Sequence, residues 1–288
     1  MSDRLRTEAA RTNVAGTDGL NDGRGYPAHR DLIPPGERRH GRYLLRFAET
    51  EGDLDRVLRL RYEVFNLELG EGHETSHETG RDRDHYDGHC HHLMVLDRRR
   101  DLLAGTYRMM TSEIAKSGAG LYTSELFELD AIPRDVMNAS IELSRACIAR
   151  NYRNQHVLFL LWRGLARYLR HNDKRYLLGC CSLTSQDSEV ALACWRHLSA
   201  TGCVHPTISV LPRPQFACLD RTACEGEGDG GAPAEFDLPG LFRAYMRHGA
   251  KICGAPAIDR AFKTIDFPVL LDSLALTPAM TRLFFENR

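Results

Sequence analysis

The chain has 288 residues, of which 42% are hydrophobic and 27% charged, a composition that argues against wholesale disorder and against a membrane-embedded protein. Its 38 basic residues nearly balance its 39 acidic ones. The sequence therefore lacks the basic excess that phosphate binding demands, and we expect no nucleic-acid partner. The nine cysteines form no pairs with zinc-site spacing and predict reduced, buried thiols.

Residues 1–38 are rich in Gly, Arg, Asp and Thr and lack apolar periodicity. They predict a disordered tail, followed by one domain over 39–288. No stretch of this tail could serve as the apolar core of a signal peptide, which predicts a cytoplasmic protein. Apolar runs such as 157–162 are far shorter than the roughly 20 residues that span a bilayer, so any membrane contact would be peripheral.

Periodicity predicts these elements in chain order: a strand over 41–48, a helix over 53–69, a hairpin of strands 92–96 and 105–110, a strand over 140–148, a helix over 155–169, a strand over 176–182, a helix over 188–200 and a strand over 264–271. We expect Asp53 to cap the first helix and Gly70 to end it. The glycine-rich segment 222–235 predicts a flexible loop. Hairpins followed by a strand-helix-strand unit predict an α/β fold, with helices on both faces of a mixed central sheet.

The segment 141–169 carries the strongest chemical signal, because a strand with charged residues runs into a basic turn and then into a helix start. Free N–H groups at a helix N-terminus favour phosphates, and Arg150 and Arg153 add positive charge there. Glu142 could accept a proton from an attacking amine. Alternatively, Glu142 and Arg145 form a structural ion pair, and the segment alone leaves both interpretations open.

Seven segments occur in an order that resembles the ornithine N-acyltransferases that start ornithine-lipid synthesis: RYEVFNLELG (61–70), DRDHYDGHC (82–90), HHLMVLD (91–97), GTYRMM (105–110), IELSRACI (141–148), LWRGLARYL (161–169) and LLGCCSL (177–183). The block 238–271 is similar to the C-terminal part of that family, so the resemblance covers about 40–285. A subset also resembles the acyl-homoserine-lactone synthases and the N-acyl amino acid synthases: Arg61, Phe65, Asp84, Asp87, Gly105, Arg108, Glu142 and Arg145.

The resemblance implies a GNAT-like fold and a defined reaction. A (3-hydroxy) fatty acyl group would pass from acyl carrier protein to the α-amine of ornithine, with the carrier's acyl-phosphopantetheine as donor and no other cofactor. The expected partners are therefore acyl carrier protein and an amino-acid substrate. Two alternatives stay open: an N-acyl amino acid synthase for another acceptor, such as glycine or an aromatic amino acid, and a non-catalytic module that binds acyl carrier protein or lipid.

The turn RNYRNQ (150–155) departs from ordinary GNAT acetyltransferases, which hold the pyrophosphate of acetyl-CoA with a Q/R-x-x-G-x-G/A loop. A turn without glycine suits the single phosphate of a phosphopantetheine arm. In a GNAT-like fold, strand N–H groups just before this turn would meet the oxyanion. The predicted donor site comprises Ala146, Cys147, Ile148, Arg150 and Arg153.

The predicted acceptor site collects charged residues from several segments. One helical turn separates Arg61 from Phe65, so Arg61 could bind a carboxylate by its bidentate fork or lie exposed on the helix. The two aspartates of the 82–90 segment could hold the side-chain ammonium of ornithine or order a loop. The predicted substrate-binding residues are Arg61, Phe65, Asp84, Asp87, Arg108 and Arg145, with Glu142 as the general base.

The family resemblance implies that the segment 112–127 leads into the acyl-chain site, although plain core packing is the alternative. The predicted acyl-chain pocket comprises Leu121, Tyr122, Leu126, Phe127 and Trp162.

A histidine-rich cluster has the ligand types of a zinc or iron site, but we expect no metal. The cluster comprises His85, His89, Cys90, His91 and His92, beside Asp84 and Asp87. Strand alternation would send His91 and His92 to opposite faces of the sheet, and acyl transfer from a thioester needs no metal. Cys180 and Cys181 lie in an apolar strand, where buried, unreactive thiols are expected.

Overall fold

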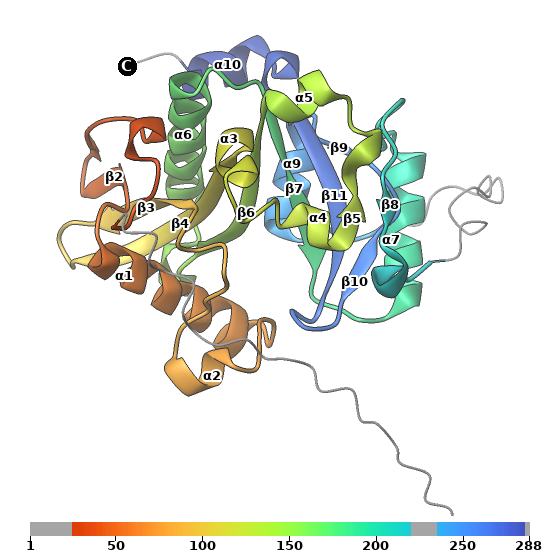
Figure 1. The fold of residues 1–288 in the computed structure, drawn as a ribbon, viewed down its shortest axis with the longest axis horizontal. Coiled ribbons are helices and arrows are strands. Elements are labelled where there is room, and N and C mark those ends of the chain that lie inside the picture. Colours follow the sequence, from red (N-terminus) through yellow and green to blue (C-terminus); the bar gives the residue numbers. More distant parts are fainter. Residues whose placement is uncertain (1–24, 220–234, 286–288) are drawn as a thin grey trace, which may run out of the picture.

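The structure, a computed structural model, describes residues 25–219 and 235–285. A nine-stranded sheet runs through this part of the chain (Figure 1). Its strands are β1 (Arg38–His40), β2 (Tyr43–Phe47), β3 (His91–Asp97), β4 (Leu102–Thr111), β6 (Ser140–Ile148), β7 (Tyr176–Leu183), β9 (Lys251–Ile252), β10 (Ala257–Asp259) and β11 (Thr264–Asp272). The order is β1-β2-β3-β4-β6-β7-β11-β10, with β9 also paired to β11. Two further strands, β5 (Phe127–Glu128) and β8 (Leu211–Pro212), pair with each other.

The helices are α1 (Glu51–Tyr62), α2 (Ser76–Thr79), α3 (Ser112–Lys116), α4 (Thr123–Leu126), α5 (Arg134–Asn138), α6 (Gln155–His171), α7 (Ser188–Ala200), α9 (Gly240–Arg247) and α10 (Pro278–Phe285). A π-helical segment, η2 (Glu63–Glu68), continues α1. Short 3-10 turns are η1 (Arg30–Leu32), η3 (Leu129–Ala131), η4 (Arg150–Tyr152), η5 (Pro214–Phe216) and η6 (Ser273–Ala275).

The sheet is mixed, as predicted. Strands β1 to β4 and β6 pair antiparallel, and β7 pairs antiparallel with β11. Between these two halves, β6 and β7 are parallel, and α6 makes the crossover between them. Parallel neighbours need such a long connection, so the expected strand-helix-strand unit is confirmed.

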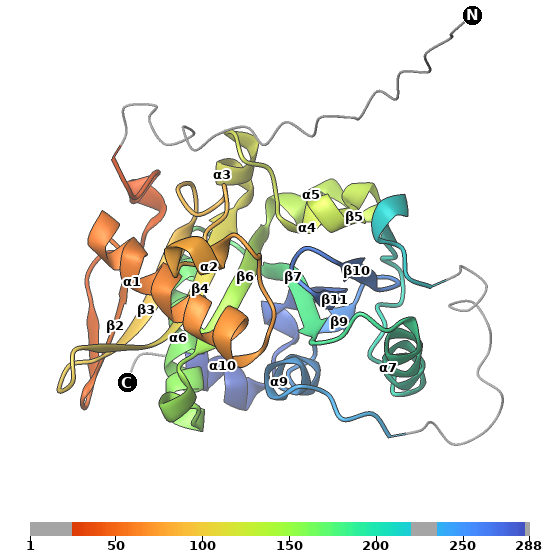
Figure 2. The same ribbon diagram turned by 90° about the horizontal axis from the view of Figure 1, so that it is seen from below.

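Helices cover both faces of the sheet (Figure 2). Successive side chains of each strand point to opposite sides, and apolar side chains on both sides need a covering layer. On β3, Leu93 and Val95 pack in the core cluster that contains α6, whereas Met94 and Leu96 pack in the one that contains α1. At Gly164, α6 lies so close to the sheet that an added Cβ would come 2.3 Å from a methyl group of Leu93.

The first helix differs from the prediction at its start. Thr50, not Asp53, is the N-cap, and its Oγ1 accepts a hydrogen bond from the Asp53 N–H at 3.1 Å. Asp53 instead pairs with Arg46, with 2.5 Å between Nη2 and Oδ1. The predicted end is confirmed, because Gly70 adopts a φ of 68°, a left-handed conformation that favours glycine.

The predicted disordered tail is wrong for residues 25–38. Tyr26 is buried, and its hydroxyl lies 3.0 Å from Nδ1 of His92. Residues 1–24, together with 222–234 of the predicted flexible loop, lie outside the described residues. In the part of the chain that the structure describes, no helix has the length and hydropathy needed to cross a membrane.

Candidate active site

The sheet opens where β6 and β7 separate. These strands pair from Ser140 opposite Tyr176 to Leu143 opposite Gly179. At Gly179 an added Cβ would lie 2.4 Å from the Leu143 carbonyl oxygen, so only glycine permits this last close approach. Beyond it, β6 continues along β4 and β7 along β11, and a cavity of about 280 Å³ lies between them. We call it the β6–β7 cavity.

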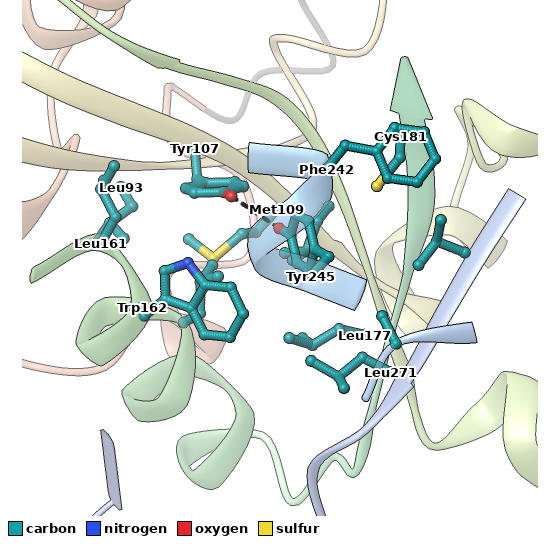
Figure 3. Packing of buried hydrophobic residues seen from close by; sticks show 14 of the residues in the cluster. Leu93, Tyr107, Met109, Leu161, Trp162, Leu177, Cys181, Phe242, Tyr245 and Leu271 are labelled. Carbon is teal, nitrogen blue, oxygen red and sulfur yellow. Dashed lines mark hydrogen bonds between the residues drawn. The ribbon is translucent and has the colours of Figure 1, made fainter. Parts of the chain in front are cut away.

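The register of β7 and β11 separates an apolar end of the β6–β7 cavity from a polar end. At one end Leu177 lies opposite Leu271, and both line the cavity (Figure 3). Five residues further along β7, on the order of 16 Å, Ser182 lies opposite Asp266. The apolar lining comprises Tyr107, Leu143, Leu177, Leu241, Phe242, Tyr245, Val269 and Leu271, and the polar lining includes Glu71, Tyr122, Arg145, Ser182, Thr184 and Asp266.

Two buried carboxyl groups lie in the polar lining. Burial and, to a smaller extent, the nearby carboxylate of Asp259 raise the pKa of Asp266 to about 7, although the Ser182 and Thr264 hydroxyls oppose the shift. Burial also raises the pKa of Glu71, whose carboxyl accepts a hydrogen bond from the Thr184 hydroxyl. No basic side chain of the described residues lies within ion-pair distance of Asp266.

Neither carboxyl group is among the residues predicted from the sequence. An acid inside the apolar run 264–271 was the available signal for Asp266, by the same argument that singled out Arg108 on its strand. Glu71 follows the end of a helix, where an exposed acid is ordinary, and its sequence neighbourhood carries no such signal.

Arg145 is the predicted arginine that reaches the cavity. Its backbone adopts a φ of 50°, which interrupts the regular strand geometry of β6. The guanidinium lies 4.0 Å from the ring centroid of Phe262 and 4.9 Å from that of Tyr122. An ion pair with Asp84, 3.3 Å between Nη2 and Oδ2, completes its surroundings, so Arg145 links the cavity to a buried charge network.

The other charged residues of the predicted acceptor site pair with one another. Arg61 lies 2.7 Å from Asp82 and 2.5 Å from Asp87, and all three side chains are fully buried. Arg108 lies 2.5 Å from Asp84 and 3.0 Å from Asp87. Burial alone would raise the pKa of Asp87, but Arg61 and Arg108 hold it well below its ordinary value.

The structure therefore brings the predicted acceptor residues together without placing them all in the cavity. Phe65 and Arg145 line it, whereas Arg61, Arg108, Asp84 and Asp87 do not. These residues form ion pairs with each other behind the wall of the cavity. Each nitrogen of Arg61 donates a hydrogen bond to Asp82 or Asp87, so none is free for a substrate carboxylate.

Glu142 does not line the cavity either, although it is buried. Its two carboxylate oxygens accept hydrogen bonds from the backbone N–H groups of Tyr122, at 3.0 Å, and Thr123, at 2.7 Å. Burial raises its pKa, and these backbone donors oppose the shift. Glu142 forms no ion pair with Arg145, so the structural alternative is wrong. Its carboxylate anchors the start of α4, and its role as general base stays a prediction.

The predicted donor site is spread over a wider region. Ala146 lines the cavity, whereas Cys147 and Ile148 pair with β4 at Thr106 and Gly105. The two arginines of the turn are exposed, and Arg153 binds Glu68 through both terminal nitrogens, at 2.5 and 2.8 Å.

Of the predicted acyl-chain residues, Tyr122 lines the cavity, at its polar end. Leu126 and Phe127 are buried in a separate core cluster, as the core-packing alternative expected, and Leu121 packs against it. Trp162 packs against Tyr245 with 5.2 Å between ring centroids and a tilt of 37° between the ring planes. The apolar lining itself comes from β4, β6, β7, α9 and β11. The acyl-chain role of the predicted residues stays a prediction.

The side chains of the histidine-rich segment do not converge on a common point. Nδ1 of His91 lies 2.7 Å from the Tyr168 hydroxyl, whereas Nε2 of His92 lies 3.3 Å from Asp87, so the predicted alternation is confirmed. Within the described residues, no three His, Cys, Asp or Glu side chains are arranged to hold a metal ion. Cys180 and Cys181 line the cavity, and burial raises both thiol pKa values.

This sheet, split between two parallel strands over a cavity, defines the class of the protein. Residues 60–163 match the family described as acetyltransferase (GNAT) domain, and this match includes β6 and the start of α6. The chain thus carries a GNAT-type α/β fold.

Comparison of the whole sequence identifies its relatives more narrowly. The chain is 28% identical over 242 residues to the L-ornithine N(alpha)-acyltransferase of Brucella abortus, which covers 81% of this chain and 85% of that protein. The same enzyme of Rhodobacter capsulatus is 28% identical over 259 residues, covering 85% and 95%. The predicted resemblance is confirmed. Among solved structures, the acyl-homoserine-lactone synthase LasI aligns with a TM-score of 0.45 at 12% identity, over 87% of this chain and 96% of that one.

Proposed function

We propose that the protein is an N-acyltransferase that moves a (3-hydroxy) fatty acyl group from acyl carrier protein to the α-amine of ornithine, the first step of ornithine-lipid synthesis. The names of its relatives support this acceptor and this reaction type. The observation that carries the proposal is the β6–β7 cavity, which joins an apolar end to buried carboxyl groups. An acyl chain fits the first and a cationic amine the second.

The two ends fit the two substrates by elementary chemistry. An acyl chain that lies against Leu177 and Leu271 loses its contact with water, worth about 0.8 kcal/mol for each buried CH₂ group. An amino acid arrives with its amine protonated, and the unpaired carboxyl groups of Glu71 and Asp266 attract that charge. For the amine to attack the thioester carbon, the acyl thioester and the amino acid must meet where β6 and β7 separate.

The donor proposal depends on the glycine-free turn 150–155. Its exposed Arg150 could bind the phosphate of a phosphopantetheine arm, a group that needs less backbone wrapping than the pyrophosphate of coenzyme A. The reaction needs no cofactor beyond that acyl-phosphopantetheine. The product would be a single-chain amphiphile, which fits a cytoplasmic enzyme in peripheral contact with the membrane.

The test is an incubation of the purified chain with a long-chain 3-hydroxyacyl carrier protein and a panel of amino acids, followed by mass spectrometry of the lipid fraction. We expect acylornithine, and faster product formation than with the matching acyl-coenzyme A. Acylation of glycine or an aromatic amino acid alone would replace the acceptor. Thioester binding without thiol release and without product would overturn the proposal in favour of a non-catalytic module.

A further inference from the structure

We propose that Asp266, a residue of β11, is the catalytic group that accepts the proton from the attacking amine. This inference rests on the proposed acyl transfer and names the residue that performs its proton-transfer step. Asp266 comes from the C-terminal strand, outside the GNAT match over 60–163.

Asp266 lines the β6–β7 cavity from β11, the strand next to β7, and Ala146 lines the cavity from β6. A thioester held in the cavity would therefore have β6 on one side and this carboxyl on the other. Asp266 is 2% exposed, so its carboxyl is largely shielded from bulk water.

The hydrogen bonds of Asp266 hold it in place and leave capacity for a proton. Oδ1 accepts from the Ser182 hydroxyl at 2.5 Å, and Oδ2 accepts from the Thr264 hydroxyl at 3.0 Å. Each carboxylate oxygen can accept two hydrogen bonds, so one acceptor position remains on each. A base must lie within hydrogen-bond reach of the amine, and a fixed carboxyl in the cavity wall meets that requirement.

The groups around Asp266 favour a base that works near neutral pH. Asp259 of β10 faces it with a negative charge, Arg145 of β6 with a positive one, and Cys180 and Cys181 of β7 with neutral thiols. Tyr122, at the start of α4, also faces it. Burial dominates these influences and places the pKa of Asp266 at about 7, close to the value at which a general base is most effective.

Glu142, the base predicted from the sequence, lacks these properties. It does not line the cavity, and both of its oxygens are engaged by backbone N–H groups at the start of α4. Loss of the Glu142 charge would disturb the segment that holds Tyr122. Glu142 is therefore a positioning residue.

The proton balance is complete without a further reactant. The Asp266 carboxylate takes one proton from the substrate ammonium, and the neutral nitrogen forms a bond to the thioester carbon. As the C–S bond breaks, the second proton of the attacking nitrogen passes to the leaving thiolate and yields a thiol. Asp266 then returns its proton to water, so that one amide, one thiol and one proton are formed.

The first experiment compares Asp266→Asn with wild type in the acylation assay, using ornithine and the carrier thioester that gives product. We expect kcat to fall by about 10²- to 10⁴-fold, the usual contribution of a general base, with KM for the carrier thioester changed by less than about threefold. Circular dichroism and thermal melting of the isosteric variant check that it folds. A variant that folds and keeps its kcat overturns the proposal.

The second experiment measures kcat/KM against pH in two neighbouring variants. In wild type the rate rises with pH through a pKa near 7, because the base must be deprotonated. Ser182→Ala removes a donor that stabilises the carboxylate and shifts this rise to higher pH. Asp259→Asn removes a neighbouring negative charge and shifts it to lower pH. A rise that stays in place in both variants, or that persists in Asp266→Asn, overturns the proposal.

Failure of this inference differs from failure of the proposed function. If the wild-type protein acylates no amino acid, the acyltransferase proposal fails first. If it acylates an amino acid and Asp266→Asn does so equally well, only the assignment of the base is wrong.

Discussion

Arg61 and Asp87 form an ion pair with 2.5 Å between Nη1 and Oδ1, and neither side chain is exposed to solvent. The pair joins the first helix to the segment that leads into β3. Asp87 also binds Arg108 of β4 at 3.0 Å, so one carboxylate connects three segments of the chain.

We predict that Asp87→Asn lowers the free energy of unfolding by about 3–5 kcal/mol, because it leaves two buried guanidinium groups without their shared carboxylate. Urea denaturation measures the change. The matched control is Asp237→Ala, which breaks the ion pair of an aspartate 93% exposed with Arg243, and should cost less than about 1 kcal/mol. Equal effects in the two variants would contradict the structural role of the network.

Asp266 should make stability depend on pH in an unusual direction. Its folded pKa of about 7 exceeds its ordinary value of 3.8, so the folded state binds the proton more tightly than the unfolded state. Its contribution to stability is highest at acidic pH, falls between pH 4 and 7, and is constant above that range. We compare the free energy of unfolding of Asp266→Asn with that of wild type at two pH values. We expect the difference, variant minus wild type, to be about 2 kcal/mol more positive at pH 8.5 than at pH 5.5. Urea titrations at both pH values test this, and an unchanged difference would refute it.

Gly179→Ala should damage the point at which β6 and β7 separate. The new Cβ would meet the Leu143 carbonyl oxygen at 2.4 Å, and a backbone group cannot move aside without shifting its strand. Such overpacking costs about 1–3 kcal/mol, and we expect weaker binding of the acyl thioester as well. Gly118→Ala is the control, since nothing lies within 4 Å of its Cβ position. Thermal melting and thioester titration measure the two effects.

Val269→Phe should shorten the acyl chain that the enzyme accepts. Val269 lines the β6–β7 cavity opposite Gly179, where a larger ring occupies space that a long chain would need. We expect the ratio of kcat/KM for short over long acyl donors to rise at least about tenfold, the effect of roughly 1.4 kcal/mol. Leu274→Phe, at a side chain 73% exposed, should leave the ratio unchanged. A parallel loss for every chain length would instead indicate general disturbance of the fold.

The sequence predicted the central elements well because their periodicity is strong. The helix over 155–169 has a strongly apolar face, and the strands around it are largely buried, so α6 and its neighbours appear where expected. The 25–38 segment was misjudged because its order depends on a few anchors, such as the contact of Tyr26 with His92, that composition does not reveal.

The site was harder to predict, for two physical reasons. Which charges pair with each other is a property of three-dimensional packing, so the sequence identified Arg61 and Asp87 as members of one cluster but not as partners. Asp266 and Ser182 are 84 residues apart and meet through strand register alone. Backbone donors, such as the N–H groups that bind Glu142, leave no mark in a sequence.

The buried charges of this protein fall into two groups with different electrostatic reach. In the network beside the cavity, of which Arg145 alone reaches the cavity lining, three arginines face three aspartates, and their opposite charges largely cancel at a distance: Arg61, Arg108, Arg145, Asp82, Asp84 and Asp87. The carboxyl groups of Glu71 and Asp266 have no such counterpart. The electric field inside the cavity is thus set mainly by the second group, and a cation entering there supplies the charge that the fold leaves unbalanced.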